Sequence, residues 1–488
     1  LNLFYARFDR ENKDPIFPSL HSTDTPPVLS THVVRCVLKN INTRKAAGPD
    51  GVLGRVLKDC AAELTDIFTT IFNLSLSTAW VPTSFKSATI TPIPKQSKVT
   101  CLNDYRPVAL TSIPAKCLEK LVIKHIKATI PPSLDTYQFA YKKNRSTEDA
   151  IAIVLHRLLE HLEHKNTYAR LLFVDYSSAF NLIRPFKLRA KLHHLGLNTA
   201  LCNWTTDFLT NRKQSVRVGK YTSSTVLINT GAPQGCVLSP LLYSLFTHDC
   251  CSSSSSNLIV KFADDTTVLG LINDNNETDY RKEVQHLVSW CNNNDLILNI
   301  TKTKEIIVDF RRRSKNHQSL SIGTEMVERV TSFKFLGVTM TEDLSWGPHT
   351  ASVVGKAQQR LYYLRKLKVA KISRQLMVNF YNCAISSVLT FDFLVWFHSC
   401  TKADQQRLQR VVKTAGKIIG TILPEMGSLY TTRCLKRVQN ILHDQHHPAH
   451  HLFHLLPSGR RYRSIKAKTT RLSNSLYPQA VRLLNSPS

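Results

Sequence analysis

Short apolar runs separated by polar turns fill the first two thirds of the chain, and longer amphipathic patterns fill the rest. The short runs are rich in β-branched residues and predict strands at 89–95, 171–174, 215–220, 224–229, 258–263, 266–272 and 333–340. Patterns with the helical period predict helices at 52–76, 113–125, 187–209, 236–246 and 279–292, over most of 350–445, and at 478–484. This order predicts a mixed α/β region followed by a mainly helical one.

Two adjacent carboxylates, Asp264 and Asp265, stand between two of these predicted strands, which predicts a hairpin with acid at its turn. Asp175 follows the apolar run 171–174 in the same manner. Like charges held against an apolar sheet are costly unless a multiply charged cation neutralises them, and three carboxylates suit Mg²⁺. Two such ions about 3.5–4 Å apart can clamp the attacking and leaving oxygens of a phosphoryl transfer. A solvent-exposed turn is the plain alternative for the acid pair taken alone.

The chain carries a large excess of positive charge. Its 488 residues include 64 Lys+Arg and 35 Asp+Glu, a formal net charge of +29, and 42% of them are hydrophobic. This composition excludes a disordered chain and favours a polyanionic partner, held through phosphate contacts that weaken with salt. A membrane surface is the rival polyanion, but no apolar run of about 18 residues occurs, and the best candidate, 384–397, carries Asp392. We therefore expect nucleic acid as a partner and no membrane.

The cysteines and histidines match no metal motif. None of the 12 cysteines has C-x-x-C spacing, which argues against a zinc knuckle or a disulfide framework and favours a reducing, intracellular compartment. Pro448 interrupts the helical spacing that a metal site with Cys434 would need. We therefore interpret as solvated the histidines His443, His446, His447, His450, His451 and His454. The first methionine is Met326, so the chain is expected to be a piece of a larger product.

Several motifs occur in an order that resembles a reverse transcriptase. They are Asp175 with Phe180, APQG at 232–235, FADD at 262–265, Asn299 with Lys302, and FLG at 335–337. Three further stretches are similar to the polymerases of LINE-type (non-LTR) retrotransposons of the Jockey-like group: KAAGPDG at 45–51, YRPVAL at 105–110 and GAPQGCVLSP at 231–240. The similarity is strong over residues 40–345 and weaker over 346–480.

The resemblance implies a right-hand polymerase of class α/β (α+β), with an antiparallel palm sheet backed by helices. It implies a linker from an absent endonuclease domain at 1–40, fingers at 41–165, a catalytic palm at 166–345, a helical thumb at 346–445 and a basic C-terminal tail at 446–488. Residues 333–337 would form the primer grip, and the basic helices at 356–371 would follow the duplex backbone. A generic charged helix face is the alternative for the latter.

The resemblance also implies roles for the acids. Asp175, Asp264 and Asp265 take the positions that hold two Mg²⁺ ions, or Mn²⁺, and the Tyr176 carbonyl would be a further ligand. A structural role is the alternative for one acid, with Asp265 as the first candidate. Phe180 would lie under the sugar, where a ring crowds a 2′-hydroxyl and favours deoxynucleotides; a place in the core is its alternative.

Further residues are expected around the incoming nucleotide. Gln234 and Gly235 would lie beside its base and sugar, because glycine permits close approach and the amide can donate and accept hydrogen bonds. A plain turn has the same composition. Lys95 and Arg106 would contact the triphosphate or the template.

Two lysines complete the predicted site. Lys302 resembles the palm lysine proposed to protonate the departing pyrophosphate, with Lys304 as a competitor and a solvated strand lysine as the plain alternative. Lys142 stands where the family usually has arginine; lysine keeps the charge but loses the bidentate fork, which weakens the expected triphosphate binding. Arg145 is expected either to compensate or to be a surface charge.

The activity implied is that of an RNA-directed DNA polymerase, which adds dNTPs to a DNA 3′-hydroxyl on an RNA template. The primer would be DNA, including nicked target DNA, and the expected location is the nucleus and cytoplasm; the sequence indicates no oligomeric state. An RNA-dependent RNA polymerase shares the chemistry but is not expected to have an aromatic at Phe180. The other alternative is a decayed or domesticated copy that only binds nucleic acid, which Lys142 favours and the intact Asp175, Asp264 and Asp265 oppose.

Overall fold

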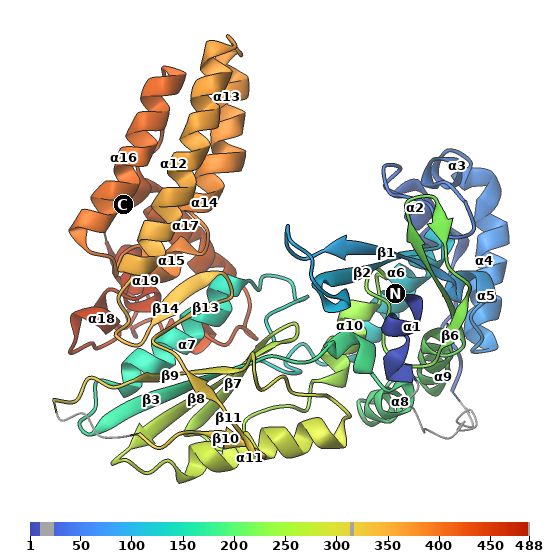
Figure 1. The fold of residues 1–488 in the computed structure, drawn as a ribbon, viewed down its shortest axis with the longest axis horizontal. Coiled ribbons are helices and arrows are strands. Elements are labelled where there is room, and N and C mark those ends of the chain that lie inside the picture. Colours follow the sequence, from blue (N-terminus) through green and yellow to red (C-terminus); the bar gives the residue numbers. More distant parts are fainter. Residues whose placement is uncertain (10–23, 313–316, 487–488) are drawn as a thin grey trace. The chain divides into compact units, whose positions relative to one another are not determined.

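The computed structural model describes residues 1–9, 24–312 and 317–486 (Figure 1). They form two compact units that interleave along the chain. Unit 1 comprises Leu1–Leu134, Tyr176–Cys250 and Ser289–Ile297, and unit 2 comprises Asp135–Asp175, Cys251–Val288 and Leu298–Ser488. The fingers, palm, thumb, linker and tail boundaries stay predictions; residues 10–23 of the linker and 487–488 of the tail lie outside the described residues.

Unit 1 combines a five-stranded sheet with helices. Its strands are β1 (Ala88–Pro94), β2 (Tyr105–Thr111), β4 (Arg212–Val218), β5 (Tyr221–Thr222) and β6 (Val226–Ile228). β1 pairs antiparallel with β2 and parallel with β4, which pairs antiparallel with both β5 and β6. A small core of Tyr5, Ala88, Ile90, Ala109 and Val216 holds the sheet against α1.

The helices of unit 1 break where the backbone turns. They are α1 (Asn2–Tyr5), η1 (Arg7–Asp9), α2 (Thr31–Lys39), α3 (Gly54–Asp59), α4 (Ala61–Ser77), α5 (Thr83–Lys86), η2 (Leu102–Asp104), α6 (Ile113–Thr129), η3 (Ala179–Leu182), α8 (Pro185–His194), α9 (Thr199–Leu209) and α10 (Ser239–Phe246). The helix predicted at 52–76 is two helices, interrupted at Cys60, and that predicted at 187–209 is divided at Gly196, whose φ is +76°. A left-handed residue ends a helix, and glycine adopts that conformation without steric cost.

Unit 2 is built on a second five-stranded sheet, with β3 (Thr167–Val174) at its centre. The other strands of unit 2 are β7 (Asn257–Phe262), β8 (Asp265–Asn273), β9 (Lys304–Val308), β10 (Ser321–Ile322), β11 (Glu325–Met326), β12 (Glu328–Arg329), β13 (Ser332–Phe335) and β14 (Val338–Thr341). The sheet has the order β12-β9-β3-β8-β7, antiparallel except for the β12–β9 pair. β13 and β14 form a separate hairpin, so the single strand predicted at 333–340 is two strands that turn at Leu336 and Gly337.

Helices α7 (Thr147–His161) and α11 (Thr278–Asn293) cover opposite faces of this sheet (Figure 1). All eight residues of β3 are buried, and successive side chains point to opposite faces. Leu171 belongs to the large hydrophobic core that includes α7. Arg170 lies on the other side of the sheet, where its guanidinium stands over the ring of Tyr280 from α11 and both side chains bind Glu305. α11 crosses the division between the units, because Thr278–Val288 falls in unit 2 and the rest in unit 1.

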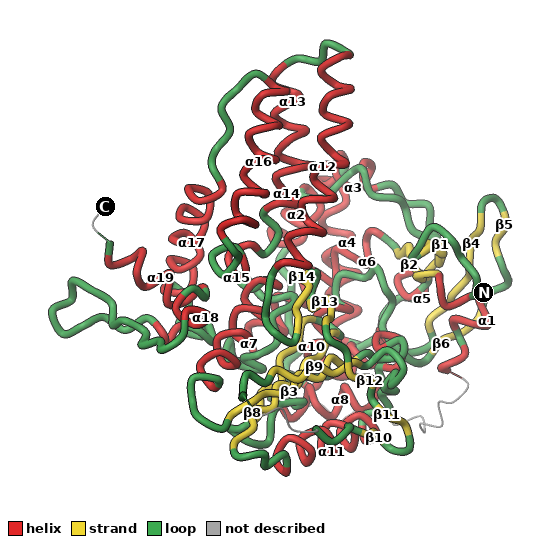
Figure 2. The backbone as a smooth tube through the Cα atoms, turned by 60° about the vertical axis from the view of Figure 1, so that its left-hand side comes forward, coloured by secondary structure: helices red, strands yellow, loops and turns green. Residues whose placement is uncertain are grey.

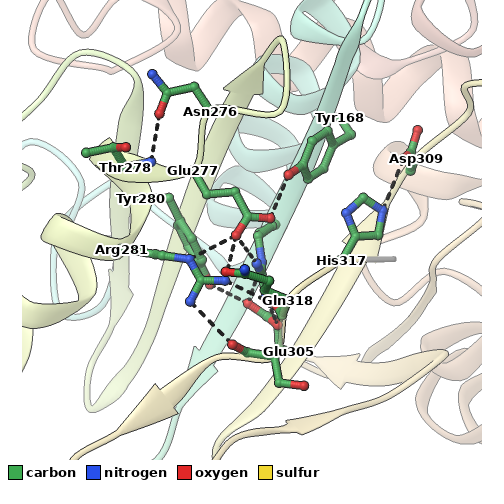
Figure 3. Close-up of polar contacts among 12 residues, drawn as sticks. Tyr168, Asn276, Glu277, Thr278, Tyr280, Arg281, Glu305, Asp309, His317 and Gln318 are labelled. Carbon is green, nitrogen blue, oxygen red and sulfur yellow. Dashed lines mark hydrogen bonds and ion pairs between the residues drawn. The ribbon is translucent and has the colours of Figure 1, made fainter. Parts of the chain in front are cut away.

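A buried polar network occupies the α11 face of the sheet (Figure 3). Arg170 donates to both oxygens of Glu305, at 3.0 and 2.6 Å, and to Glu277 at 2.6 Å. The hydroxyl of Tyr280 donates to Glu305 at 2.7 Å, and that of Tyr168 donates to Glu277 at 2.6 Å. Because every partner in the network is hydrogen-bonded, the buried arginine is compensated and fixes the register of the sheet.

The last part of unit 2 is helical, as predicted. Its helices are α12 (Gly347–Val369), α13 (Arg374–Phe380), η4 (Tyr381–Ser386), α14 (Ser387–Leu389), α15 (Phe393–Trp396), α16 (Lys402–Ile419), α17 (Met426–Leu442), η5 (His450–Leu452), α18 (Thr470–Ser473) and α19 (Leu476–Asn485). α12 and α16 pack side by side (Figures 1 and 2), and η4 is a π-helix. None of the helices in the described part of the chain has both the length and the apolar character needed to cross a bilayer.

One prediction for this region is wrong. His447 is buried, with 4% of its surface exposed, and its Nε2 lies 3.5 Å from Asp149. Burial and the neighbouring cations Arg145 and Arg437 lower its pKa to about 3, so the ring is neutral. The other five histidines of the cluster are exposed or half-buried, in keeping with the prediction. α17 ends at Leu442, before Pro448, and His447 lies against Asp149 of α7, a contact that the local sequence does not indicate.

Candidate active site

The turn of the β7–β8 hairpin carries the acid pair. Phe262 pairs with Asp265, so Ala263 and Asp264 alone form the turn, and Ala263 has a φ of +58°. Asp264 and Asp265 both retain solvent exposure. The predicted hairpin with acid at its turn is confirmed.

Asp175 reaches the same edge of the sheet from the neighbouring strand. Val174 pairs with Thr266, and continuing this antiparallel register by one residue places Asp175 opposite Asp265. Desolvation, followed by the like charges of Asp264 and Asp175, raises the pKa of Asp265 to about 6. The structure therefore brings the three predicted acids close enough to interact electrostatically.

The three acids have the chemistry to bind a divalent cation, although their side chains do not converge on one point. Within residues 1–9, 24–312 and 317–486, no group of three or more His, Cys, Asp or Glu side chains converges in metal-binding geometry. Carboxylates are nevertheless the ligands that Mg²⁺ prefers, and the pKa of Asp265 is raised by desolvation and, to a smaller extent, by the neighbouring charges of Asp264 and Asp175, which a cation would offset. Asp175, Asp264 and Asp265 are the residues that would hold the metal.

Gln138 fixes the acid-bearing turn, and the sequence-based reasoning did not identify it. Its side chain has no exposed surface, and its Oε1 accepts hydrogen bonds from the backbone N–H groups of Ala263 and Ala140, both at 3.0 Å. Its Nε2 donates to the Ala263 carbonyl at 3.3 Å. One buried amide therefore satisfies both backbone groups of the residue that precedes Asp264. No local pattern distinguishes this glutamine from an exposed one; its partner is 125 positions away.

A second turn supports Asp175. The Asn299 N–H donates to the Asp175 carbonyl at 2.8 Å, and the Thr303 hydroxyl accepts from the Asp175 N–H at 3.3 Å. Lys302 lies in this turn and is exposed, and its ammonium makes no hydrogen bond or ion pair with any described residue. The competing Lys304 is bound to Glu328 at 2.6 Å and to the Thr301 carbonyl. Of the two lysines, only Lys302 therefore has an uncommitted ammonium beside Asp175.

Lys142 and its neighbours are more tightly bound than the sequence suggested. The Lys142 ammonium donates to the Asp135 carbonyl at 2.7 Å, and desolvation lowers its pKa to about 8. Arg145, expected to compensate for it or to be a surface charge, is neither: its side chain is 5% exposed and pairs with Asp444 at 2.5 Å. It also donates to the His446 carbonyl at 2.9 Å. Arg145 therefore fixes the C-terminal segment and is not available to a triphosphate.

Tyr141 is a further neighbour of the acids. Its φ is +61°, and its ring is 47% exposed. Burial of the hydroxyl, followed by the charge of Asp264, raises its pKa. The charge of Asp264 therefore acts on the Tyr141 hydroxyl, and Tyr141 was not among the predicted site residues.

The other predicted residues belong to unit 1. Phe180 stacks on Tyr243, with ring centroids 4.6 Å apart, and is half-buried. The Gln234 carbonyl accepts from the Ala109 N–H at 2.7 Å. Gly235 has a φ of +141°, and a Cβ on it would stand 2.3 Å from the Ala109 carbonyl oxygen. Close approach to β2 therefore requires a glycine here, and its predicted contact with the nucleotide stays a prediction.

Unit 1 also contains Gly231 and the predicted site residues Tyr176, Lys95 and Arg106. A Cβ on Gly231 would meet the Asn181 backbone at 2.7 Å, so this glycine too serves backbone packing. Tyr176 is buried. Lys95 and Arg106 are exposed on the β1–β2 hairpin, and the Lys95 ammonium donates to the Asn103 carbonyl at 2.6 Å.

The chain matches known polymerases over most of its length. The family model described as "Reverse transcriptase (RNA-dependent DNA polymerase)" matches residues 93–340, and a model for the N-terminal region of alkylated DNA repair protein alkB homolog 8 matches residues 346–387. Curated relatives include the probable RNA-directed DNA polymerase from transposon BS of Drosophila melanogaster, 25% identical over 85% of this chain and 48% of its own length. The RNA-directed DNA polymerase from mobile element jockey of the same organism is 26% identical over 74% of this chain and 41% of its own.

A more distant relative is the Pol polyprotein of type-1 retrotransposable element R1 of Bradysia coprophila, 22% identical over 77% of this chain and 38% of its own. The chain thus spans about half or less of the length of the curated relatives that it matches.

Proposed function

The chain belongs to the reverse transcriptase (RNA-dependent DNA polymerase) family, and from this premise we propose that it adds dNTPs to a DNA 3′-hydroxyl on an RNA template. The observation that carries the proposal is the β3–β8 register, which sets Asp175 opposite Asp265 beside Asp264. Acids from two strands at one sheet edge are the arrangement that phosphoryl transfer with divalent metals requires. Names of the relatives, which describe RNA-directed DNA polymerases, support the same reaction.

We propose that Asp175, Asp264 and Asp265 bind two Mg²⁺ ions, with the Tyr176 carbonyl as a further ligand and Mn²⁺ as a substitute. Such ions lower the barrier by neutralising charge on the attacking and leaving oxygens. The chain supplies the positioning: Gln138 holds the Asp264 turn, and the 299–303 turn holds Asp175.

Lys302 is the proposed general acid. Its exposed ammonium lies in the turn that binds the Asp175 backbone, so it can donate a proton to the leaving pyrophosphate oxygen. Lys304 is committed to Glu328, which supports the choice. Lys142 keeps its proton at neutral pH despite the lowered pKa, and its proposed role is to add positive charge for the triphosphate.

Further residues are proposed to contact the nucleotide and the template. Phe180, held by its stack on Tyr243, is proposed to exclude a 2′-hydroxyl and so select deoxynucleotides. Gln234 and Gly235 are proposed to contact the base and sugar. Lys95 and Arg106 are proposed to contact the triphosphate or template strand, for which their exposure is suitable.

The proposed setting is intracellular, in the nucleus and cytoplasm, with nicked target DNA as a primer. All twelve cysteines are free thiols, which is compatible with a reducing compartment. The net charge of +29 supports the polyanionic partners.

The test is primer extension on a poly(rA)/oligo(dT) duplex with dTTP and Mg²⁺. Asp264→Asn should lower extension by roughly 10²–10³-fold, because the loss of one carboxylate ligand removes about 3–4 kcal/mol of transition-state stabilisation. The matched control is Asp274→Asn, an exposed aspartate just past the other end of the same strand, which should extend normally. Binding of the duplex is measured in parallel by fluorescence anisotropy.

Three outcomes decide between the functions. Extension lost only in Asp264→Asn, with binding intact, supports the polymerase and its acids. Equal extension by both variants refutes the assigned acids. Salt-sensitive binding without extension by the unaltered chain supports a nucleic-acid-binding remnant.

A further inference from the structure

A polar cavity of about 680 Å³ lies in the helical part of unit 2, away from the acids. Its walls come from the N-terminal end of α7, from the η4–α14 segment, from residues 390–394 and from α17. We call it the α17 pocket. Its volume lies within the range of about 300–1,000 Å³ that is usual for small-ligand sites. One wall is the π-helix η4, a distortion that is frequent at functional sites.

An exposed aromatic ring stands at this pocket. Phe391 is 45% exposed, so part of its ring faces the pocket that it lines. Its ring is held against the β13–β14 turn, because a Cβ on Gly337 would stand only 2.8 Å from its Cε1 atom. A fixed, half-exposed ring provides a stacking surface for a planar ligand, and every nucleobase offers such a plane.

The pocket also has positive charge available for a phosphate. Arg437 is committed to Asp149 and Ser146, and Arg433 donates to the Thr390 carbonyl at 3.3 Å. Lys436 is exposed and forms no ion pair or hydrogen bond among the residues that the structure describes. An ammonium on an exposed helix face beside a cavity can bind a phosphate oxygen without first breaking another contact.

Two acids also line the pocket. Burial raises the pKa of Glu148 to about 7, so about half of it is neutral at pH 7, and raises that of Asp392 to about 6, so Asp392 stays mostly charged and the phosphate must lie on the Lys436 side. Asn382 and Asn440 also line the cavity and make no side-chain hydrogen bond with described residues. Their amides can both donate to and accept from the polar edge of a base.

We propose that the α17 pocket binds one unpaired nucleotide of a nucleic-acid strand, with its base stacked on Phe391, its phosphate on Lys436 and its base edge against Asn382 and Asn440. A duplex base is already stacked and paired, so a cavity with one aromatic wall fits an unstacked nucleotide. The strand can be RNA or DNA, since base, phosphate and stacking are common to both. The inference rests in part on the proposed polymerase function, which supplies single-stranded template and primer ends.

Photo-cross-linking tests the site directly. The full chain is mixed with a ten-nucleotide strand that contains one 5-iodouracil, as RNA or as DNA, irradiated and analysed by mass spectrometry of its peptides. The expected cross-link is to Phe391, and free uridine monophosphate should reduce it. A cross-link from RNA alone identifies the template as the source, from DNA alone the primer, and from both the shared chemistry. No cross-link at Phe391 with either strand overturns the proposal.

Matched variants show whether the contact contributes to binding. Phe391→Leu should weaken binding of the ten-nucleotide strand about tenfold, whereas Tyr363→Leu, a 59% exposed aromatic on α12, should not. Lys436→Ala should reduce the slope of log affinity against log salt concentration by about 0.7. Lys413→Ala, on α16, is the control and should reduce the slope by less. Both lysines are exposed, so neither variant threatens folding. Equal effects within each pair would overturn the proposal.

Primer extension by the same preparation separates the two hypotheses. Extension without a cross-link at Phe391 overturns the pocket and leaves the polymerase. A cross-link without extension supports the pocket and counts against the polymerase.

Discussion

Gln138→Leu tests whether the buried amide determines the geometry of the acid turn. Leucine has similar bulk but removes three hydrogen bonds, two to Ala263 and one to Ala140. Each neutral hydrogen bond contributes about 1 kcal/mol net, and Ala263 is half-buried, so water replaces part of the loss. The expected destabilisation is therefore about 2–3 kcal/mol. Activity should fall further than stability, since a displacement of about 1 Å at a catalytic group costs about 100-fold.

The assay measures primer extension and urea unfolding on the same preparation, with rates taken well below the unfolding midpoint. The control is Thr350→Val, which removes a fully buried hydroxyl that donates within α12, at a site away from the acids. It should lose a similar order of stability and retain its extension rate. If Gln138→Leu is destabilised yet extends at the unaltered rate per folded molecule, the amide does not position Asp264 and the reasoning is refuted.

Three more predictions test other parts of the chain. Gly235→Ala should destabilise it by about 3 kcal/mol or more, because the new Cβ would stand 2.3 Å from the Ala109 carbonyl oxygen, whereas Gly347→Ala, in open space, should be close to neutral in thermal melts. Phe180→Ala should lower the preference for dNTPs over rNTPs about tenfold in single-nucleotide incorporation, and an unchanged ratio would exclude the ring as the selector. Burial raises the pKa of Glu119 from 4.5 to about 7, so the folded chain binds the extra proton and stability falls as pH rises through this window. In urea unfolding between pH 4.5 and 7.5, Glu119 should contribute up to about 3 kcal/mol to the decline, and Glu119→Gln should make the decline smaller by that amount; a pH profile identical to that of the unaltered chain would contradict the shift.

Local patterns predicted the elements that depend on local physics. The hairpin around Asp264 follows from alternation and a two-residue turn, and the helical final part follows from the 3.6-residue period. Helix ends were less predictable: the patterns ran through Cys60 and Gly196, where the backbone in fact breaks. The spacing of apolar residues shows which face of a helix is buried. Two helices separated by a short break can bury the same face, so the spacing does not reveal the break.

Features that depend on distant partners could not be predicted. Gln138 looks like any polar residue until its partner Ala263, 125 positions away, is placed beside it. His447 lies in a histidine-rich stretch that looks hydrated, yet it is buried beside Asp149. The sequence shows that Gly235 allows close approach but not that the Ala109 carbonyl stands where its Cβ would be; the contact of Gly235 with a nucleotide stays a prediction. In each case the partner is chosen by tertiary packing.

The ion pair between Arg145 and Asp444 has a consequence for the order of synthesis. Its members are 299 positions apart, and Arg437 similarly reaches back to Asp149. At about 5–20 residues per second, Asp444 leaves the ribosome roughly 15–60 s after Arg145. Once Asp265 has been made, the nascent chain contains all three predicted acids, but until Asp444 follows the segment from Lys142 to Asp149 lacks its last ties. A chain that stops before Arg437 would retain every predicted acid and lose both anchors.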